Sequence, residues 1–137
     1  MNKQLNNDVF ATLPEGTGEA IRFTTTDNES VVFNALNGNG TAIKDMLGED
    51  IFVTDIVVTS VDVPADRNKP EGEKINKPCV NFFTEDDEVY TSLSNGIIRA
   101  TKNLLAVMAP SLDNPIHIKF GTVSTGKGTA HTFRLVR

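Results

Sequence analysis

The 137-residue sequence lacks tryptophan and contains a single cysteine, Cys79. One cysteine excludes an internal disulfide framework and a zinc site built from four thiolates. No stretch approaches the roughly 18 consecutive apolar residues of a membrane-spanning helix, and residues 1–8 lack the apolar run of a secretory signal. We therefore expect a cytoplasmic protein with no membrane partner, folded around one hydrophobic core without cross-links.

Positive charge is also scarce. The chain carries 13 lysines and arginines against 18 aspartates and glutamates, a formal net charge of −5. This balance argues against binding of duplex DNA through bulk charge. However, residues 1–63 contain ten acids and three bases, whereas residues 89–137 contain one acid and six bases. Residues 89–137 therefore have a net charge of +5, which is compatible with a local basic surface.

No complete catalytic motif is present. Residues 121–129 come near the phosphate-binding pattern Gly-x4-Gly-Lys-Ser/Thr, but Gly128 stands where that pattern has its magnesium-binding hydroxyl. The residues that follow alternate like a strand, whereas a phosphate loop needs a helix there. The two histidines, His117 and His131, have no third ligand at a metal-binding spacing. We therefore expect a protein that is not an enzyme and that has no cofactor and no metal site.

The N-terminal part divides into an arm and the start of a domain. Residues 1–18 are polar and rich in asparagine, which predicts a flexible arm. Residues 19–137 are expected to form a single domain. Two strand-like runs, at 20–25 and 30–36, are joined by residues that favour a turn, and this pattern predicts an N-terminal hairpin.

From residue 51 onward, the pattern is typical of a small β-barrel. Its elements follow in the order strand, long loop, hairpin, helix and two strands, at 51–63, 65–78, 79–92, 95–108, 116–123 and 130–136. Five strands with one helix between the third and the fourth is the order of elements in an OB-fold. We therefore predict a mainly β protein with a five-stranded OB-fold barrel, one helix between strands 3 and 4, and the hairpin as an N-terminal extension.

An OB-fold binds a single strand of nucleic acid across its middle strands, between the loops that join strands 1 to 2 and 4 to 5. Basic side chains neutralise phosphates, and exposed rings stack on bases. The basic candidates are Arg67, Lys69, Lys74, Lys77, Lys119, Lys127 and Arg134. The aromatic candidates are Phe82, Phe83, Tyr90 and Phe120, and Phe133 also falls on a barrel strand. Because Phe82 and Phe83 are adjacent in one strand, we expect one ring to face the core and the other to face outward.

Several short segments resemble those of a known family. They are Leu47-Gly48-x-x-Ile51-x-Val53-x-Asp55, Asp86-Asp87-Glu88-Val89-Tyr90-x-Ser92-x-Ser94, Pro115-Ile116-His117-Ile118-Lys119-Phe120, Gly126-Lys127-Gly128 and Thr132-Phe133-x-Leu135. Together they resemble the small single-stranded DNA-binding proteins of bacteriophages and conjugative elements of Gram-positive bacteria, over residues 41–137. The resemblance implies an OB-fold that coats single-stranded DNA. It also implies that Tyr90 lies on a binding hairpin, with Lys119 and Lys127 nearest the DNA.

Three functions fit these observations. The first is a non-enzymatic protein that coats single-stranded DNA, or RNA, with little sequence specificity in replication or conjugative transfer in a bacterial host. Copies of the chain would self-associate along the DNA or form a homodimer. The second is a β-rich structural or adaptor protein of phage or plasmid assembly without nucleic-acid binding, which explains the acidic first half better. The third is an OB-fold that binds RNA or oligosaccharide.

Overall fold

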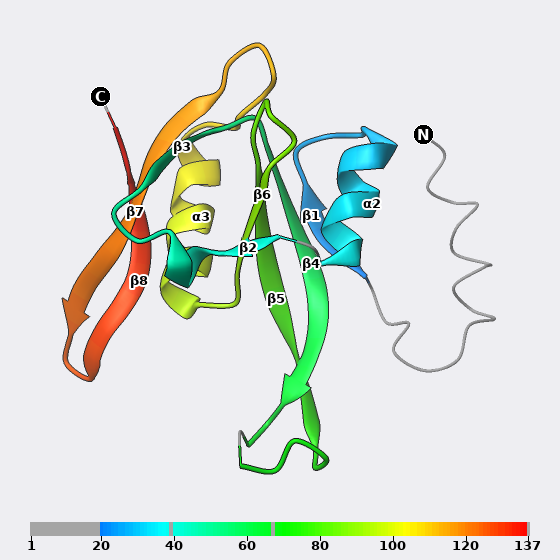
Figure 1. The fold of residues 1–137 in the computed structure, drawn as a ribbon, viewed down its shortest axis with the longest axis vertical. Helices are drawn as coiled ribbons and strands as arrows, with labels where there is room; N and C mark the ends of the chain where they lie inside the picture. The colour runs from blue at the N-terminus through cyan, green and yellow to red at the C-terminus, as the bar shows by residue number, and fades with distance from the viewer. Residues whose placement is uncertain (1–19, 39, 67, 137) are drawn as a thin grey trace.

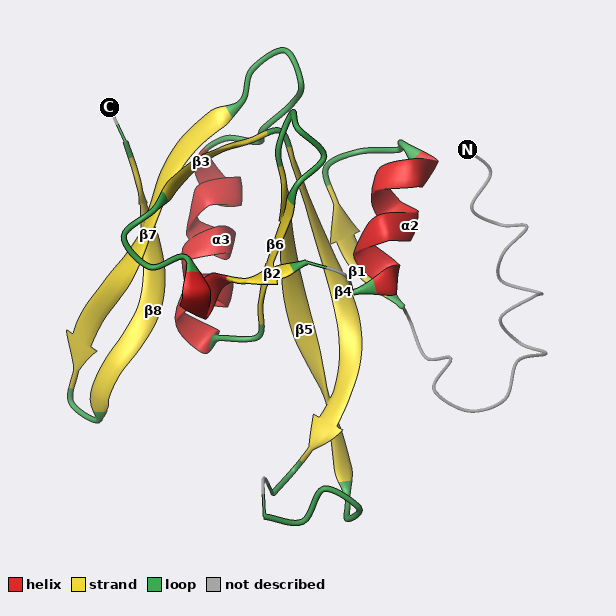
Figure 2. Cartoon of the chain, in the orientation of Figure 1, coloured by secondary structure: helices red, strands yellow, loops and turns green. Residues whose placement is uncertain are grey.

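The computed structural model describes residues 20–38, 40–66 and 68–136 (Figure 1). The expected arm at 1–18 and Arg67 lie outside these residues. The described elements are β1 (Ile21–Thr24), α2 (Glu29–Asn37), β2 (Thr41–Ala42), the 3-10 turn η1 (Ile43–Asp45), β3 (Asp50–Val53), β4 (Asp55–Pro64), β5 (Lys74–Phe83), β6 (Val89–Ser92), α3 (Asn95–Val107), β7 (Ile116–Thr125) and β8 (Gly128–Leu135). The described part is mainly β, as predicted (Figure 2). Within it, neither helix has the length and hydrophobicity needed to cross a membrane.

The long strand expected at 51–63 is two strands that belong to different sheets. β3 pairs antiparallel with β7 in a three-stranded sheet, and β4 pairs antiparallel with β5 in a five-stranded sheet. Thr54 separates them, and both its N–H and its hydroxyl donate to the carbonyl oxygen of Phe83, at 2.8 and 3.2 Å. The strand changes sheets at this point, so the main core takes Ile51 and Val53 before Thr54 and Ile56 after it, while Val57 enters a second core.

The C-terminal strands are connected as in an OB-fold. β3 and β4 together take the place of its first strand, and β5 to β8 take the places of the second to fifth strands. The first strand pairs with the second and the fourth, the second with the third, and the fourth with the fifth. Among the described residues no ladder joins β6 to β8, so the barrel is open there. The edge of β6 pairs instead with β2, in parallel.

Helix α3 occupies the open side of the barrel, as Figure 1 shows. It packs against β8 and β5 and buries Ile97 and Leu104 in the main core. Thr101 is also buried, and its hydroxyl donates to the carbonyl of Ile97 at 2.8 Å, so no polar atom is left unpaired in that core position. The predicted helix between the third and fourth strands is confirmed.

The prediction of an N-terminal hairpin is wrong in its second strand. β1 forms and pairs with β4, but residues 29–37 form helix α2. The Asn28 side-chain oxygen accepts from the N–H groups of Ser30 and Val31, at 2.9 and 3.3 Å, and Gly38 ends the helix in the left-handed region at φ +67°. These two caps stabilise a helix in a Ser-Val-Val-Phe run whose composition favours a strand.

Helix α2 covers the face of the five-stranded sheet that points away from the main core. Ala35 packs there against Val57 and Phe83 in a second, smaller core. Along β5 and β6, alternate side chains therefore enter two cores: Phe82 and Tyr90 enter the main one, whereas Phe83 enters the smaller one.

The loop expected at 65–78 is shorter in the structure. The β4–β5 ladder runs from the pair Asp55–Phe83 to the pair Pro64–Lys74, which leaves residues 65–73 as the connection. The N–H of Ala65 donates to the carbonyl of Glu73 at 2.9 Å and closes the base of this connection. Lys74 and Lys77 therefore lie on a strand and not in a loop, on a hairpin that extends well beyond the rest of the five-stranded sheet (Figure 1).

Candidate nucleic-acid interface

The four aromatic candidates lie in the protein interior. The exposed fractions of Phe82, Phe83, Tyr90 and Phe120 are 0, 4, 8 and 1%. The expectation that Phe82 or Phe83 faces outward is wrong, because α2 covers the ring of Phe83. Phe82, Phe120 and Phe133 pack edge to face, with ring centroids 5.5–6.5 Å apart. In this conformation none of these rings is open to a base, and their role in binding stays a prediction.

Tyr90 shows how firmly one of these rings is fixed. Its hydroxyl donates to the carboxylate of Glu88 at 2.9 Å, while its ring packs toward Phe120 with centroids 6.4 Å apart. Burial, and then the hydrogen bond to Glu88, raise the pKa of the Tyr90 phenol. The resemblance placed this residue on a binding hairpin, and it does lie on β6, but its ring faces the core.

The three-stranded sheet presents a row of charged side chains on the face away from the core. In the β3–β7 ladder, Ile51 and Ile118 are paired and buried, so the neighbouring pair of Asp50 and Lys119 points to the other face. Lys119 is also the register partner of Arg134 on β8. The sheet therefore carries Asp50, Lys119 and Arg134 side by side, one from each strand.

Lys119 and Arg134 line one surface groove, which we call the basic groove. Its lining residues are Leu47, Gly48, Lys119, Phe120, Gly121, Thr122, Thr132, Phe133 and Arg134. The connection before β3 is fixed beside it, because the N–H of Gly48 donates to the carbonyl of Phe120 at 2.9 Å and the N–H of Phe120 donates to the carbonyl of Glu49 at 3.0 Å. None of these lining residues is acidic, so the groove suits an anion.

A stacked pair of rings lies on the same face of this sheet. Phe52 and His117 are register partners, and their ring planes are 15° apart with centroids at 4.2 Å. His117 Nε2 donates to Asp50 Oδ2 at 2.5 Å, and this hydrogen bond lowers the pKa of the Asp50 carboxyl. Phe52 keeps 55% of its surface exposed. Sequence reasoning missed this residue, although its parity, opposite to that of Ile51 and Val53, was a usable signal.

An acidic groove borders the other side of Phe52. It is lined by Asp50, Ile51, Phe52, Thr84, Glu85, Asp86, Glu88, Tyr90 and Pro115. Its carboxylates come from the connection between β5 and β6 and from the start of β3. A phosphate would be repelled there. Along β3, Phe52 borders this acidic groove, and Asp50 lies between Phe52 and the basic groove, as the register partner of Lys119.

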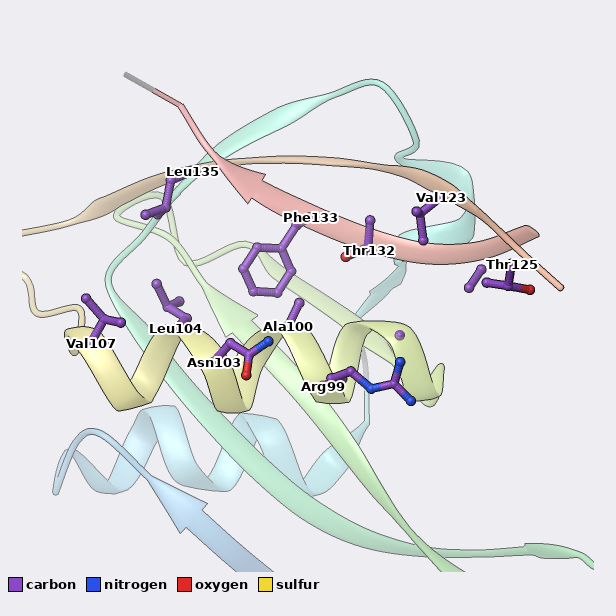
Figure 3. Close-up of a pocket in the computed structure, with 12 residues that line it drawn as sticks. Arg99, Ala100, Asn103, Leu104, Val107, Val123, Thr125, Thr132, Phe133 and Leu135 are labelled. Carbon is purple, nitrogen blue, oxygen red and sulfur yellow. The ribbon is translucent and has the colours of Figure 1, made fainter. Parts of the chain in front are cut away.

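A third groove lies between α3 and the β7–β8 hairpin (Figure 3). Phe133 points from β8 toward Ala100 and Leu104, and Arg99 lies nearer the start of the helix. Apolar side chains form most of its lining, and Arg99 is the one charged residue among those that line it in the described part of the chain. This groove marks the open side of the barrel and carries too little charge for a phosphate track.

The remaining basic candidates lie at other places. Lys69, Lys74 and Lys77 belong to the β4–β5 hairpin, and Lys74 Nζ donates to the carbonyl of Pro70 at 2.7 Å. Lys127 lies in the turn between β7 and β8, where its N–H donates to the hydroxyl of Thr125 at 3.2 Å. The structure thus brings Lys119 and Arg134 together and places Lys127 at the turn of the same β7–β8 hairpin, whereas Lys69, Lys74 and Lys77 belong to the separate β4–β5 hairpin (Figure 1).

Comparison with known proteins identifies a family. The family model of phage single-stranded DNA-binding proteins matches residues 8–135, which include the β1–α2 extension as well as the OB-fold strands. Comparison with curated proteins and with solved structures finds no significant match. Because the family model spans nearly the whole sequence, this chain belongs to the family of phage single-stranded DNA-binding proteins.

Proposed function

We propose that this protein coats single-stranded DNA, with little sequence specificity and without catalysing a reaction, during phage DNA replication in the cytoplasm of a bacterial host. The observation that carries the proposal is that Lys119 and Arg134, register partners on β7 and β8, line one groove that no acidic residue lines. The family to which the chain belongs supports the same function. Conjugative transfer would require the same chemistry, because it also exposes single-stranded DNA.

The chemistry of the basic groove accounts for weak sequence preference. Lysine and arginine side chains that neutralise phosphates position a strand without reading its bases. Each phosphate contact releases counterions, so the affinity should fall with salt, with a slope of about 0.7 per contact for single strands. The net charge of −5 keeps the affinity for duplex DNA low, since bulk charge opposes it.

The other basic candidates would extend the contact with DNA. Lys69, Lys74 and Lys77 lie on a hairpin that extends from the domain, and Lys127 lies at a second hairpin turn. Arg67 belongs to the same β4–β5 connection in the sequence. A strand long enough to reach both hairpins would contact all of them, and copies of the chain would self-associate along it or as a homodimer.

The experiment is a titration of labelled oligonucleotides followed by fluorescence anisotropy at several salt concentrations. We expect salt-sensitive binding of oligo(dT), weaker binding of duplex DNA, and a smaller salt slope for Lys119→Gln/Arg134→Gln. Comparing the affinity for oligo(dT) with that for an RNA of equal length measures the preference for DNA. The matched control is Arg99→Gln/Lys102→Gln, which removes two exposed charges from α3. Absence of salt-sensitive oligo(dT) binding, or an equal loss in the control, would contradict the proposal.

A further inference from the structure

We propose that Phe52 and His117 form a base-stacking platform for single-stranded DNA beside the basic groove. This inference rests on the proposed function and adds to it the place where a base is held. It adds an exposed ring to the aromatic candidates on β5, β6 and β7, whose rings are buried in this conformation.

The first support is the exposure of Phe52. Among the aromatic side chains on β3 to β8, all in the described part of the chain, Phe52 alone is mainly exposed, at 55%. Burying a phenylalanine side chain contributes roughly 1.5–3 kcal/mol, so a large ring left in solvent on a rigid strand is not explained by the stability of the domain. A base that covered the ring would remove that apolar surface from water.

The second support is that the platform is already ordered. Phe52 stacks on His117 with ring planes 15° apart, and the Asp50 carboxylate holds the imidazole through the hydrogen bond to Nε2. Both rings lie on paired strands, where the ladder fixes the backbone of each. A preordered ring loses little side-chain entropy when a base stacks on it.

The third support is the charge on either side. His117 and Lys119 are two residues apart on one face of β7, which corresponds to about 7 Å along a strand. A base on the platform and a phosphate at Lys119 can therefore belong to neighbouring nucleotides. On the other side, Glu85 and Asp86 repel a backbone. The Asp50 carboxylate beside Lys119 is hydrogen-bonded to His117, so the strand leaves the platform toward the two cations, Lys119 and Arg134, that line the basic groove.

The first test uses Phe52→Leu, which keeps an apolar side chain without a ring, and Phe52→Tyr, which keeps the ring. Stacking is worth about 1–3 kcal/mol per base, so Phe52→Leu should weaken oligo(dT) binding by about fivefold or more. Phe52→Tyr should bind like the wild type. An abasic oligonucleotide of equal length should bind the wild type and Phe52→Leu equally, because it offers phosphates and no bases. Phe23→Leu, at an exposed ring on β1, is the matched control and should change nothing.

The second test uses Phe52→Trp, which introduces the only tryptophan of the chain. Oligo(dT) should quench its fluorescence, whereas the abasic oligonucleotide should leave it unchanged. Phe23→Trp should be insensitive to both. Circular dichroism and thermal unfolding confirm that each variant is folded.

The outcomes separate the two proposals. If Phe52→Leu binds oligo(dT) like the wild type, or Phe52→Trp is not quenched, while Lys119→Gln/Arg134→Gln still weakens binding, the platform is wrong and the proposed function stands. If the wild type shows no salt-sensitive binding of oligo(dT), both proposals fail.

Discussion

Gly96, in the first turn of α3, lies against the backbone of His131 on β8. A Cβ at Gly96 would come within 2.1 Å of the His131 carbonyl oxygen, a distance that side-chain carbons do not adopt. The missing side chain allows the start of α3 to pack this closely against β8 on the open side of the barrel, where no ladder joins β6 to β8 among the described residues. The absence of a side chain at Gly96 is therefore part of how this OB-fold is completed.

We expect Gly96→Ala to destabilise the protein, although alanine is the better helix former. Helix propensity favours alanine by about 1 kcal/mol, but the clash is with a backbone atom and forces a shift that costs about 1–3 kcal/mol. Urea unfolding followed by circular dichroism measures the difference. Gly121→Ala is the control, because nothing lies within 4 Å of its Cβ position. Equal stability of both variants would show that α3 can move away from β8.

The Asn28 cap of α2 provides a second prediction. Asn28→Ala removes the acceptor for the N–H groups of Ser30 and Val31 and should lower the free energy of unfolding by about 1 kcal/mol. Urea titration checks the value. Asn34→Ala, on the exposed side of the same helix, should be neutral or slightly stabilising. An unchanged stability of Asn28→Ala would argue against a capped helix at residues 29–37.

The Cys79 thiol should react slowly with thiol reagents in the folded protein. Burial raises the pKa of its thiol, which lowers the fraction of thiolate at neutral pH. We expect a thiol reagent at pH 8 to modify the folded protein much more slowly than the urea-unfolded chain. Equal rates in the two states would contradict this burial.

The same pKa shift has a consequence for stability. A thiol whose folded-state pKa is raised contributes stability that is complete below the unfolded pKa, about 8.5, and is lost as the pH rises through the folded value. The free energy of unfolding should therefore fall above pH 8.5 in the wild type. Cys79→Ser should remove the part of this fall that the thiol causes, and a pH series of urea titrations measures it.

Neutralising the acidic groove should strengthen binding of single-stranded DNA. Glu85→Gln/Asp86→Asn removes two carboxylates that line the groove beside Phe52. We expect the affinity for oligo(dT) to rise by up to about fivefold at low salt and the gain to vanish at high salt, because exposed charges are screened. Asp45→Asn/Asp113→Asn, at two other exposed positions, is the charge-matched control. An equal gain in both would mean that only net charge matters.

Much of the fold could be predicted from local patterns. The helix expected at 95–108 is observed as α3 at Asn95–Val107, and the last two strands form as expected, although each extends two residues farther toward the turn that joins them. The prediction failed at residues 29–37, where two caps outweighed the β propensity of the run. It also failed at Thr54, where the chain passes from one sheet to the other. A single long strand and two successive strands in different sheets have the same local pattern of apolar residues, so the sequence does not distinguish them.

The candidate site was less accessible to sequence reasoning. Lys119 and Arg134 were among the basic candidates, but their pairing depends on the register of β7 and β8. One ring of the adjacent pair Phe82 and Phe83 was expected to face outward, but both are buried, because α2 covers Phe83 on the second face of the sheet. Phe52 was not among the aromatic candidates: parity places it on the face opposite Ile51 and Val53, but only the structure shows that this face leaves the ring exposed.

By itself, the sequence determined the order of the OB-fold elements, because turns, alternation and helical spacing act over a few residues. It also determined where basic residues concentrate along the chain. Only the tertiary structure decided which face of each strand is covered, and therefore which rings are core and which are open to a base. The physical reason is that side chains alternate with a period of two along a strand, whereas the helix or sheet that covers one face comes from a distant part of the chain.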